Sequence, residues 1–434
     1  MNQSQETLLT SIEKPRFTGK TLVMLNPETS QKRIFSQAKN ASLRLAAFSE
    51  YAGPESDFNK AFDEGDGIVF ERLGIAVINE HRDREVSMLT ESATAGNTFL
   101  YSEPERYIYA LNGPFDDFLT GYKSAVDDLY NRLVKKEGTN KPVLLQHQSD
   151  KNNSWGIIAT QVHTSKYTGN GVKIAILDTG LKTDHPDFAG RSIETYSFIT
   201  DETVDDRNGH GTHCTGIASG DNNKGSGYRY GVAKEAMIYF GKVLSNRGVG
   251  TDKSILAGLD WALSNGCNIV SMSLGAALNP GESYSRAYDD VAKKALKQGT
   301  LIIAAAGNES KRHLGQIAPV GHPANCPSIM AVAALDNTMN VASFSCGGIN
   351  GDGGQIDIAG PGVEVYSSWI APENYKTISG TSMATPFVAG VAALLWEANP
   401  GASAAEIWML LTQGAKRLSL KDSDVGAGLV QAPQ

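Results

Sequence analysis

The pattern of apolar positions divides the chain of 434 residues near residue 150. In the first part, short apolar runs alternate with segments of helical spacing. These predict helices and strands as follows: a strand at 19–27, a helix at 31–52, two strands within 67–79, a helix at 83–94 and a strand or strand pair at 99–111. The order β-α-β-β-α-β is that of a compact ferredoxin-like sandwich. A further helix is predicted at 115–138 and a polar linker or processing segment at 141–154.

Continuous apolar runs characterise the second part of the chain. Residues 171–180 (GVKIAILDTG) contain a run without polar alternation, which is typical of a parallel strand buried on both faces. Similar runs alternate with helical patterns, with strands expected at 266–275, 299–310 and 328–335 and helices at 252–266 and 285–299. This alternation predicts a doubly wound, mainly parallel α/β sheet, where function lies at the carboxyl ends of the strands.

Composition adds a few constraints to this picture. The chain is 41% hydrophobic and 20% charged, contains 45 glycines and is long enough for two domains, which we expect at 1–149 and 150–434. A net charge of −8 argues against nucleic acid as the main partner. No apolar run approaches the ~18 residues of a membrane span. The N-terminus lacks the apolar core of a secretory signal, so we expect a cytoplasmic protein as the sequence is written, or a secreted one if a signal precedes this numbering.

Four cysteines are scattered without CxxC or Cys/His metal spacing: Cys214, Cys267, Cys326 and Cys346. In a cytoplasmic protein they are expected to be reduced, small buried residues. A redox role for Cys214, which follows a pair of histidines, is the alternative.

Three segments combine residues that suit catalysis. Asp178 closes a predicted strand, His210 and His213 lie in GHGTHCTG (209–216), and Ser382 lies among small residues in GTSMATP (380–386). Asp178 and Ser382 also suit helix caps, and the paired histidines suggest a metal site, although no third ligand of suitable type stands nearby. An imidazole is a good general base at neutral pH, and His210, directly after a glycine, is better placed to face a cleft than His213.

Together these segments resemble the subtilisin-like serine proteases, the subtilases. ILDTG (176–180), GHGTHCTG, SMSLG (271–275), AAAGNE (304–309) and GTSMATP follow the family's order of Asp, His and Ser over about residues 155–434. The resemblance implies a serine endopeptidase acting on peptides or proteins, with Ser382 as nucleophile, His210 as general base and Asp178 orienting the imidazole. It also implies that Asn308 and the Ser382 backbone N–H stabilise the oxyanion. Pro386 is expected in the first turn of the helix that starts near Ser382.

The resemblance extends to a substrate cleft. Residues Gly248, Val249 and Gly250 match the edge strand that pairs with an extended peptide. One wall of the primary specificity pocket matches Ser273, Leu274 and Gly275, and the other matches Ala305, Ala306 and Gly307. Because these wall residues are small, the pocket has room for a large apolar side chain of the substrate. Glu309 at the pocket mouth would also allow a substrate Lys or Arg to bind. A broad endopeptidase and a narrow processing protease that matures one precursor both remain open; a non-catalytic platform is disfavoured because all three catalytic positions are filled.

Calcium is the cofactor that the resemblance implies. Asp187 matches the acid of the family's tight site and Asp357 that of its weaker site, while the loop 221–231, including Asn223, would supply further oxygen ligands. This loop is longer than its subtilisin counterpart, and the acids also suit ordinary turns.

The first domain resembles the subtilisin propeptide, a folding chaperone and inhibitor, by its β-α-β-β-α-β pattern and its position before the protease. The resemblance implies that the last strand and the segment KPVLLQHQ (141–148) lie in the substrate cleft. Self-cleavage is then expected between residues 140 and 153, and until then the N-terminal domain holds the protease as an inactive zymogen.

Overall fold

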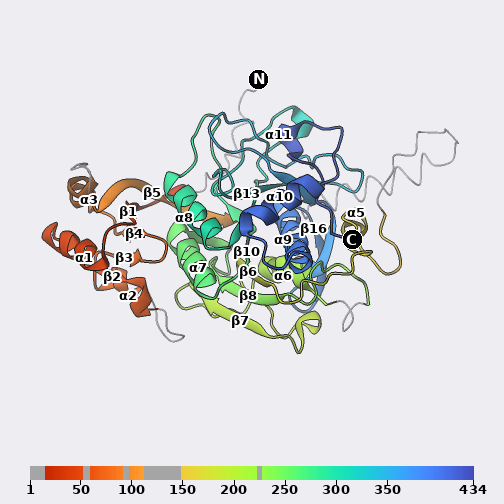
Figure 1. Cartoon of the computed structure of the whole chain (residues 1–434), viewed down its shortest axis with the longest axis horizontal. Coiled ribbons are helices and arrows are strands. Elements are labelled where there is room, and N and C mark those ends of the chain that lie inside the picture. Colours follow the sequence, from red (N-terminus) through yellow and green to blue (C-terminus); the bar gives the residue numbers. More distant parts are fainter. Residues whose placement is uncertain (1–14, 52–58, 91–96, 112–147, 222–226) are drawn as a thin grey trace, which may run out of the picture.

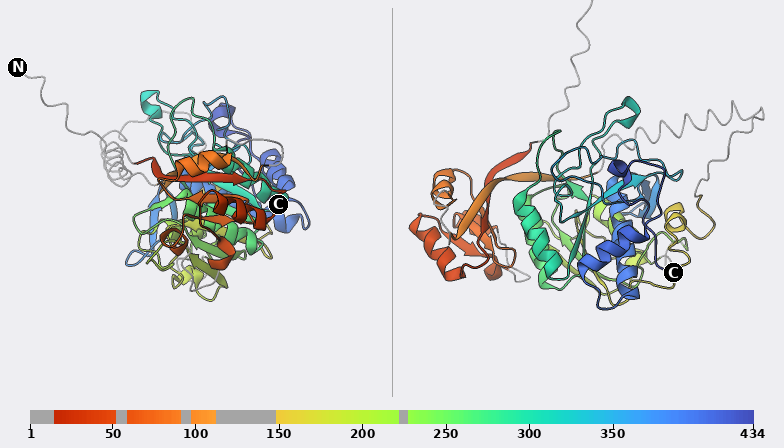
Figure 2. Two further views of the ribbon diagram at one scale, coloured as in Figure 1. Left: turned by 90° about the vertical axis from the view of Figure 1, so that its left-hand side faces the viewer. Right: turned by 45° about the horizontal axis from the view of Figure 1, so that its top comes forward.

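A computed structural model describes residues 15–51, 59–90, 97–111, 148–221 and 227–434. Figure 1 shows a smaller body formed by residues 15–111, which we call the N-terminal module, beside a larger body formed by residues 148–434, the catalytic part. The last strand of the module, β5 (Phe99–Ala110), leaves the smaller body and runs onto the larger one (Figure 2). Among the helices of these ranges, none has the length and apolar character needed to cross a bilayer.

One sheet forms the centre of the module, with strand order β5-β1-β4-β3-β2. Its pairs are antiparallel except that of β2 with β3. On one face Val23 packs with Ile34 of α1 and Val86 of α3, while Leu22 and Ile68 join the core shared with the catalytic part. The bounds are β1 Phe17–Leu25, α1 Gln31–Asn40, β2 Leu45–Ala47, η1 Phe48–Tyr51, α2 Lys60–Asp63, β3 Gly67–Phe70, β4 Ile75–Ile78 and α3 Asp83–Thr90.

The helix predicted over 31–52 is wrong in its second half. α1 ends at Asn40, and Ser42 follows with a left-handed φ of 63°. The chain then forms β2, which pairs in parallel with β3. Backbone hydrogen bonds to a sheet edge thus outweigh the helical spacing of the apolar residues. The segment predicted as helix at 115–138 lies outside the described residues.

The catalytic part is built on a parallel sheet with strand order β14-β13-β12-β10-β6-β8-β7. The predicted parallel α/β sheet is therefore confirmed. β8 and β10 lie on opposite sides of β6, so the strand order reverses beside Asp178 at the carboxyl end of β6. The strands are β6 Lys173–Asp178, β7 Ile193–Ser197, β8 Met237–Lys242, β10 Ile269–Met272, β12 Leu301–Ala305, β13 Met330–Leu335 and β14 Ile358–Pro361.

Helices flank this sheet, with α7 and α8 on the side of the module (Figure 1). Local capping explains where they begin: Ser254 Oγ accepts from the Thr251 N–H at 3.1 Å, and Ser285 Oγ accepts from the Tyr288 N–H at 3.2 Å. The remaining bounds are α5 Trp155–Ala159, η2 Pro186–Phe188, α6 His210–Ser219, β9 Val249–Thr251, α7 Asp252–Ser264, β11 Leu274–Gly275, α8 Arg286–Lys297, η3 Arg312–Leu314, β15 Val365–Ser368, β16 Tyr375–Ile378, α9 Thr381–Ala398, α10 Ala404–Gly414 and α11 Asp422–Val425.

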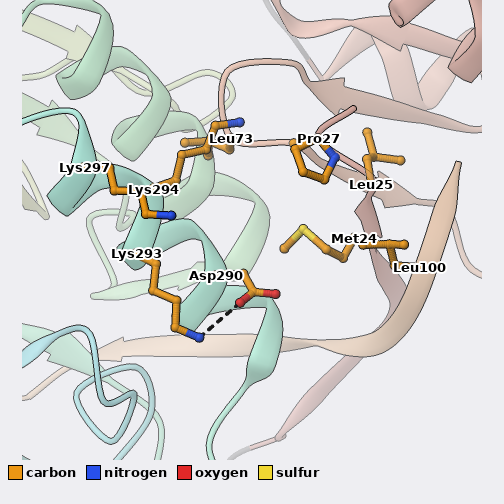
Figure 3. A pocket seen from close by; sticks show the side chains of 10 residues that line it. Met24, Leu25, Pro27, Leu73, Leu100, Asp290, Lys293, Lys294 and Lys297 are labelled. Carbon is orange, nitrogen blue, oxygen red and sulfur yellow. Dashed lines mark hydrogen bonds and ion pairs between the residues drawn. The ribbon is translucent and has the colours of Figure 1, made fainter. Parts of the chain in front are cut away.

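Two zones are prominent among the contacts between the module and the catalytic part. In the first, residues 107–111, which we call the tail, lie between β9 and β11. In the second, the hairpin zone, the turn between β3 and β4 lies against α7 and α8, where Arg72 Nε donates to Ser264 Oγ at 2.9 Å. Cavities of about 340 and 560 Å³ remain in this zone. Figure 3 shows the smaller one, with Leu73 and Pro27 of the module facing the lysines of α8.

Candidate active site

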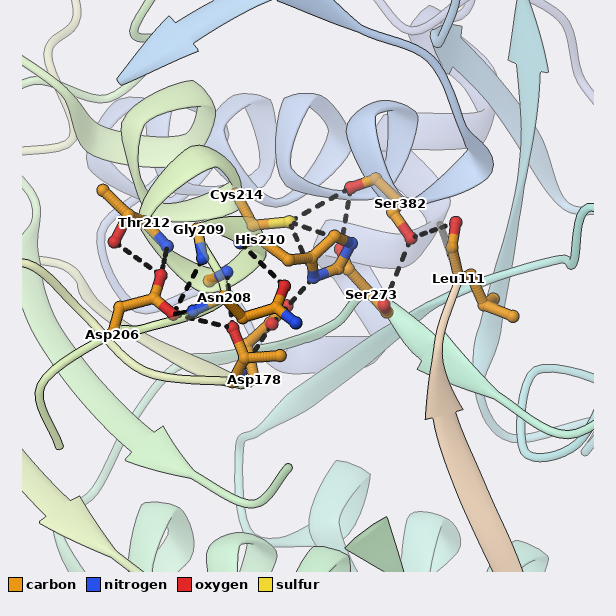
Figure 4. A network of polar contacts seen from close by, with 12 residues as sticks. Leu111, Asp178, Asp206, Asn208, Gly209, His210, Thr212, Cys214, Ser273 and Ser382 are labelled. Carbon is orange, nitrogen blue, oxygen red and sulfur yellow. Dashed lines mark hydrogen bonds and ion pairs between the residues drawn. The ribbon is translucent and has the colours of Figure 1, made fainter. Parts of the chain in front are cut away.

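Asp178 and His210 meet where β6 ends and α6 begins. The Nδ1 of His210 donates to Oδ1 of Asp178 at 2.7 Å, and both side chains are fully buried (Figure 4). Burial disfavours the charged imidazole, but the adjacent Asp178 carboxylate outweighs it and raises the pKa of His210 well above its ordinary value. The carboxylate therefore orients the ring and leaves Nε2 as the nitrogen that can exchange a proton with another group.

His213 packs inward, one turn further along α6. Its Nε2 contacts the carbonyl oxygen of Lys376 at 3.0 Å. Burial lowers the pKa of His213 to about 3, which keeps the ring neutral. This histidine is therefore a structural residue.

Ser382 is the second residue of α9 and lies beside His210 (Figure 4). Its hydroxyl lies 3.1 Å from the carbonyl oxygen of Ser273 and 3.3 Å from that of Leu111, and donates to these oxygens rather than to His210. The predicted acid, base and nucleophile thus lie together, with the hydroxyl turned towards two backbone carbonyls.

Pro386 lies in the second turn of α9, not in the first as predicted. Proline has no N–H, so the carbonyl of Ser382, four residues earlier, lacks its usual helical donor. Ser273 Oγ donates to this carbonyl at 2.8 Å and the Cys214 thiol at 3.5 Å. The proline thereby lets neighbouring side chains fix the backbone of Ser382.

Asn308 follows β12 and is held by the residue before Ser382. Its Oδ1 accepts from the backbone N–H and the hydroxyl of Thr381, each at 2.9 Å. This fixes the amide so that Nδ2 donates to the carbonyl oxygen of Leu111, the last residue of the tail. A peptide carbonyl therefore lies where the predicted oxyanion donor and the predicted nucleophile meet.

The strand predicted to bind an extended peptide lies along one side of the tail. The carbonyl of Gly248 accepts from the Ala110 N–H at 2.9 Å. A Cβ on Gly248 would lie 3.3 Å from the Cβ of Ala110, so glycine allows this close approach. The antiparallel register pairs Val249 with Tyr109 and Gly250 with Ile108.

One of the predicted pocket walls lies on the other side of the tail. β11 pairs antiparallel with the tail, Leu274 with Ala110 and Gly275 with Tyr109. The Leu111 side chain approaches Gly275, with Cδ1 at 3.4 Å from the position of a Cβ there. Ser273 contacts Ser382 as described above. The second wall is buried and consists of Ala305, the last residue of β12, with Ala306 and Gly307 after it.

Two glutamates of β5 that the sequence analysis missed contact the first turns of α7 and α8. Glu105 accepts from the Lys253 N–H at 3.0 Å. Glu103 accepts from Ser285 Oγ at 2.6 Å and from the Ala287 N–H at 3.2 Å. Carboxylates are stabilised at helix N-termini by the unpaired N–H groups and the helix dipole. In the sequence these glutamates look like the ordinary polar face of a strand.

Asp187, a predicted calcium ligand, is fully buried in η2. Its Oδ2 accepts from Tyr230 OH at 2.6 Å, whereas its buried Oδ1 has no hydrogen-bond partner in the described part of the chain. An orphaned buried carboxylate oxygen suits a cation ligand. Asn223, the ligand predicted from the neighbouring loop, lies outside the described residues.

Asp357 fits a cation less well. Its Oδ2 accepts from the Ala331 N–H at 2.7 Å, and burial raises its pKa to about 7. It borders a cavity of about 520 Å³ that also contains Asp422, but Arg417 supplies a positive charge to the same space.

Cys214 lies against the candidate pair. Its sulfur is 3.9 Å from both ring nitrogens of His210, and Asp178, His210 and Cys214 form a cluster of potential metal ligands. Burial raises the pKa of the thiol, which disfavours the thiolate that redox or metal chemistry needs. All four cysteines are buried and free, as expected for packing residues.

An imidazole paired with a buried aspartate, a serine at a helix start and an amide aimed at a carbonyl oxygen define a serine hydrolase of acyl groups. The order of the three residues along the chain is that of one particular family. A model of that family, the subtilase family, matches residues 169–428, and the chain belongs to it. It is a serine endopeptidase.

Individual relatives agree with this assignment. The chain is 38% identical to subtilisin DY of Bacillus licheniformis over 265 residues, 60% of this chain and 90% of that protein. It is 39% identical to thermitase of Thermoactinomyces vulgaris over 253 residues, 58% of this chain and 83% of that protein. The solved structure of sphericase superposes with a TM-score of 0.56 at 35% identity, covering 64% of this chain and 98% of sphericase.

Proposed function

We propose that the protein cleaves peptide bonds through an acyl-enzyme, with Ser382, His210 and Asp178 as the reacting and orienting groups. The Ser382 oxygen attacks the peptide carbonyl carbon while its proton passes to Nε2 of His210. The C–N bond then breaks and His210 returns the proton to the leaving amine. Water, deprotonated by the same imidazole, hydrolyses the resulting ester and frees Ser382.

The observation that carries this proposal is the contact of the Leu111 carbonyl oxygen with Asn308 Nδ2 and the Ser382 hydroxyl. In the tetrahedral intermediate this oxygen becomes negative, and Asn308 Nδ2 and the Ser382 backbone N–H would stabilise it. Before attack, the Ser382 hydroxyl must rotate about its Cα–Cβ bond from the two backbone carbonyls towards His210.

The N-terminal module is proposed to be an intramolecular inhibitor that keeps the enzyme in zymogen form. Its tail occupies both edges of the cleft that an extended substrate would need. Glu103 and Glu105 add hydrogen bonds to the first turns of two helices of the catalytic part. These contacts favour a bound module, and a bound module excludes substrate.

The position of the tail supports a different processing site from the one expected at 140–153. Because the Leu111 oxygen contacts the oxyanion donor, the bond that Ser382 would attack is Leu111–Asn112. Cleavage there would separate the module at the end of β5 and leave the segment from residue 112 attached to the catalytic part.

A broad specificity is the preferred proposal for substrates in trans. The Leu111 side chain lies against Gly275, and the residues that match the second pocket wall, Ala305, Ala306 and Gly307, are also small. Such a pocket accepts many apolar side chains and contains few groups that reject alternatives. A narrow processing protease is the second candidate, because the tail is a single sequence fitted to the whole cleft.

Calcium is proposed as a stabilising ion, with Asp187 as the best-suited residue among those described. Calcium prefers carboxylate and carbonyl oxygens and would provide a partner for the orphaned Oδ1 of Asp187. Chelation with EDTA is then expected to lower the melting temperature of the Ser382→Ala protein, and Asp187→Asn to abolish that sensitivity.

Intact-mass measurement of the expressed wild-type chain and of Ser382→Ala tests the proposed function. We expect wild type to give the fragments 1–111 and 112–434, and Ser382→Ala to stay whole. A junction at 140–153 would support the earlier expectation for the processing site. An uncut chain that hydrolyses casein would contradict the zymogen, and a wild type without any hydrolysis would contradict the proposed chemistry.

Digestion of casein beside a peptide library tests the specificity. Cleavage after many apolar residues supports a broad endopeptidase. Cleavage confined to sequences like Ile-Tyr-Ala-Leu, the tail residues 108–111, supports a processing protease.

A further inference from the structure

Asp206 lies outside the motifs that identify the family, yet its carboxylate is the most heavily hydrogen-bonded acid near the site. It is 3% exposed. Oδ1 accepts from the N–H groups of Asn208 and Gly209, each at 3.0 Å, and Oδ2 accepts from the N–H and the hydroxyl of Thr212, at 3.0 and 2.7 Å. These donors belong to the chain immediately before and within the first turn of α6, the helix that begins with His210.

The same carboxylate also reaches the strand that carries Asp178. Thr179 Oγ1 donates to Asp206 Oδ1 at 3.2 Å and accepts from the Gly211 N–H at 3.0 Å. The Thr179 N–H in turn donates to Oδ1 of Asp178 at 2.6 Å. Asp206 is therefore linked by hydrogen bonds to the residues that flank both Asp178 and His210, as Figure 4 shows for the helix side.

The local backbone explains why such a group is needed. α6 starts after Gly209, which has a left-handed φ of 100° and provides no side chain to cap the helix. Asp206 therefore satisfies N–H groups that a Ser or Asp at the cap position would otherwise bind. Without it, the helix start could shift relative to β6, and a shift of ~1 Å at a reacting group can cost ~10² in rate.

We propose that Asp206 is a positioning residue of the active site, which sets the His210 ring against Asp178 by binding the first turn of α6 and the Thr179 hydroxyl. It contacts neither substrate nor the reacting atoms. The proposal rests on the base role proposed for His210, which His210→Ala tests separately.

Asp206→Asn is the first test, because the side chain keeps its shape while one acceptor oxygen becomes an NH₂ donor. This donor then faces the backbone N–H groups that the carboxylate binds. The full chain is purified after processing, and active sites are counted by titration with a serine-directed inhibitor. Per active site, we expect kcat to fall 10- to 100-fold with KM within 3-fold of wild type. The control is Asp205→Asn, whose carboxylate is half exposed and paired with Lys182; its kcat is expected within 2-fold of wild type.

The pH profile distinguishes positioning from a loss of folded protein. If Asp206 holds the Asp178–His210 pair, the acidic limb of kcat/KM moves to lower pH in Asp206→Asn. In that variant the Asp178 carboxylate stabilises the charged imidazole less, so the pKa of His210 falls. A purely structural defect lowers the amplitude and leaves the limb in place. A variant with wild-type kcat and an unmoved limb would overturn the proposal.

Thr179 provides a second pair of variants if Asp206→Asn does not fold. Thr179→Val removes the bridging hydroxyl at nearly constant shape, and Thr179→Ser keeps it. We expect Thr179→Val to lose 3- to 10-fold in kcat and Thr179→Ser to stay within 2-fold of wild type. Equal kcat values for the two variants would contradict the proposal.

Discussion

The tail and the hairpin zone join the same two parts of the molecule in different ways. In the tail, strand pairing runs along both edges and Ile108 is fully buried. In the hairpin zone, side chains meet across cavities of about 340 and 560 Å³. There Asp260 has a buried Oδ1 without a hydrogen-bond partner among the described residues. The difference is that continuous backbone pairing joins the two parts next to the active site, whereas side chains join them in the hairpin zone.

The largest effect is expected at Asn308, which contacts the end of the tail. Asn308→Ala should slow separation of the module by about 10²–10³-fold, the loss known for the corresponding donor in subtilisin. The rate at which the 1–111 fragment appears, followed by intact mass, measures this. Asn340→Ala, in an exposed turn, is the control and should process at the wild-type rate.

A smaller effect is expected when the part of β5 that leads into the tail is compared with the hairpin zone. The double change Glu103→Gln with Glu105→Gln weakens charge-assisted hydrogen bonds at two helix starts by about 1 kcal/mol each. The cleaved module then dissociates more readily from the catalytic part. We therefore expect hydrolysis of a small peptide substrate, measured with both fragments present after processing, to rise about 30-fold. Arg72→Ala, which removes the hydrogen bond to Ser264 Oγ in the hairpin zone, should change it less than about 3-fold, because one hydrogen bond of an exposed arginine contributes only about 0.5 kcal/mol. An equal rise for Arg72→Ala and for the double glutamate variant would show that the hairpin zone holds the module as strongly as β5 does.

The smallest effect concerns the charge buried in the hairpin zone. Burial raises the pKa of Asp260 to about 6, above its value in the unfolded chain. The folded state therefore holds the proton more tightly, and the destabilisation is absent at low pH and grows as pH rises through about 6. In the Ser382→Ala background, Asp260→Asn should raise the free energy of unfolding at pH 8 by about 1 kcal/mol and leave it almost unchanged at pH 4.

Thermal melts at the two pH values measure this change. Asp63→Asn, at an exposed acid of the module, is the control. A gain for Asp260→Asn at pH 4 as large as at pH 8 would show that relief of the buried charge is not its cause.

Local patterns in the sequence were sufficient to predict the strands of the catalytic part and the residues of the candidate site. The strands of the catalytic part are continuous apolar runs because both faces are buried, and such runs can be recognised without knowing their partners. Asp178, His210, Asn308 and Ser382 stand in short motifs, and the structure brings these four side chains together.

What was missed depends on pairing between distant segments. Leu111 reaches Asn308 only because β5 takes one register against β9 and β11, and no local pattern specifies that register. Asp206 acts through backbone N–H groups whose need for a partner becomes visible only when α6 is known to start after a glycine. Residues 45–47, within the second half of the helix predicted at 31–52, form a strand for the same reason, since β2 pairs with β3.

The contact between Ser382 and Leu111 joins residues 271 positions apart, which has a consequence for the order of events during synthesis. The tail leaves the ribosome first, and at about 5–20 residues per second the nucleophile is added roughly 15–50 s later. α9 is buried from Thr381 to Trp396, so it cannot be placed until the strands around it have assembled. A nascent chain therefore carries the residues that pair with β9 and β11 long before it carries Ser382, and the catalytic part completes its folding with strand β5 already synthesised.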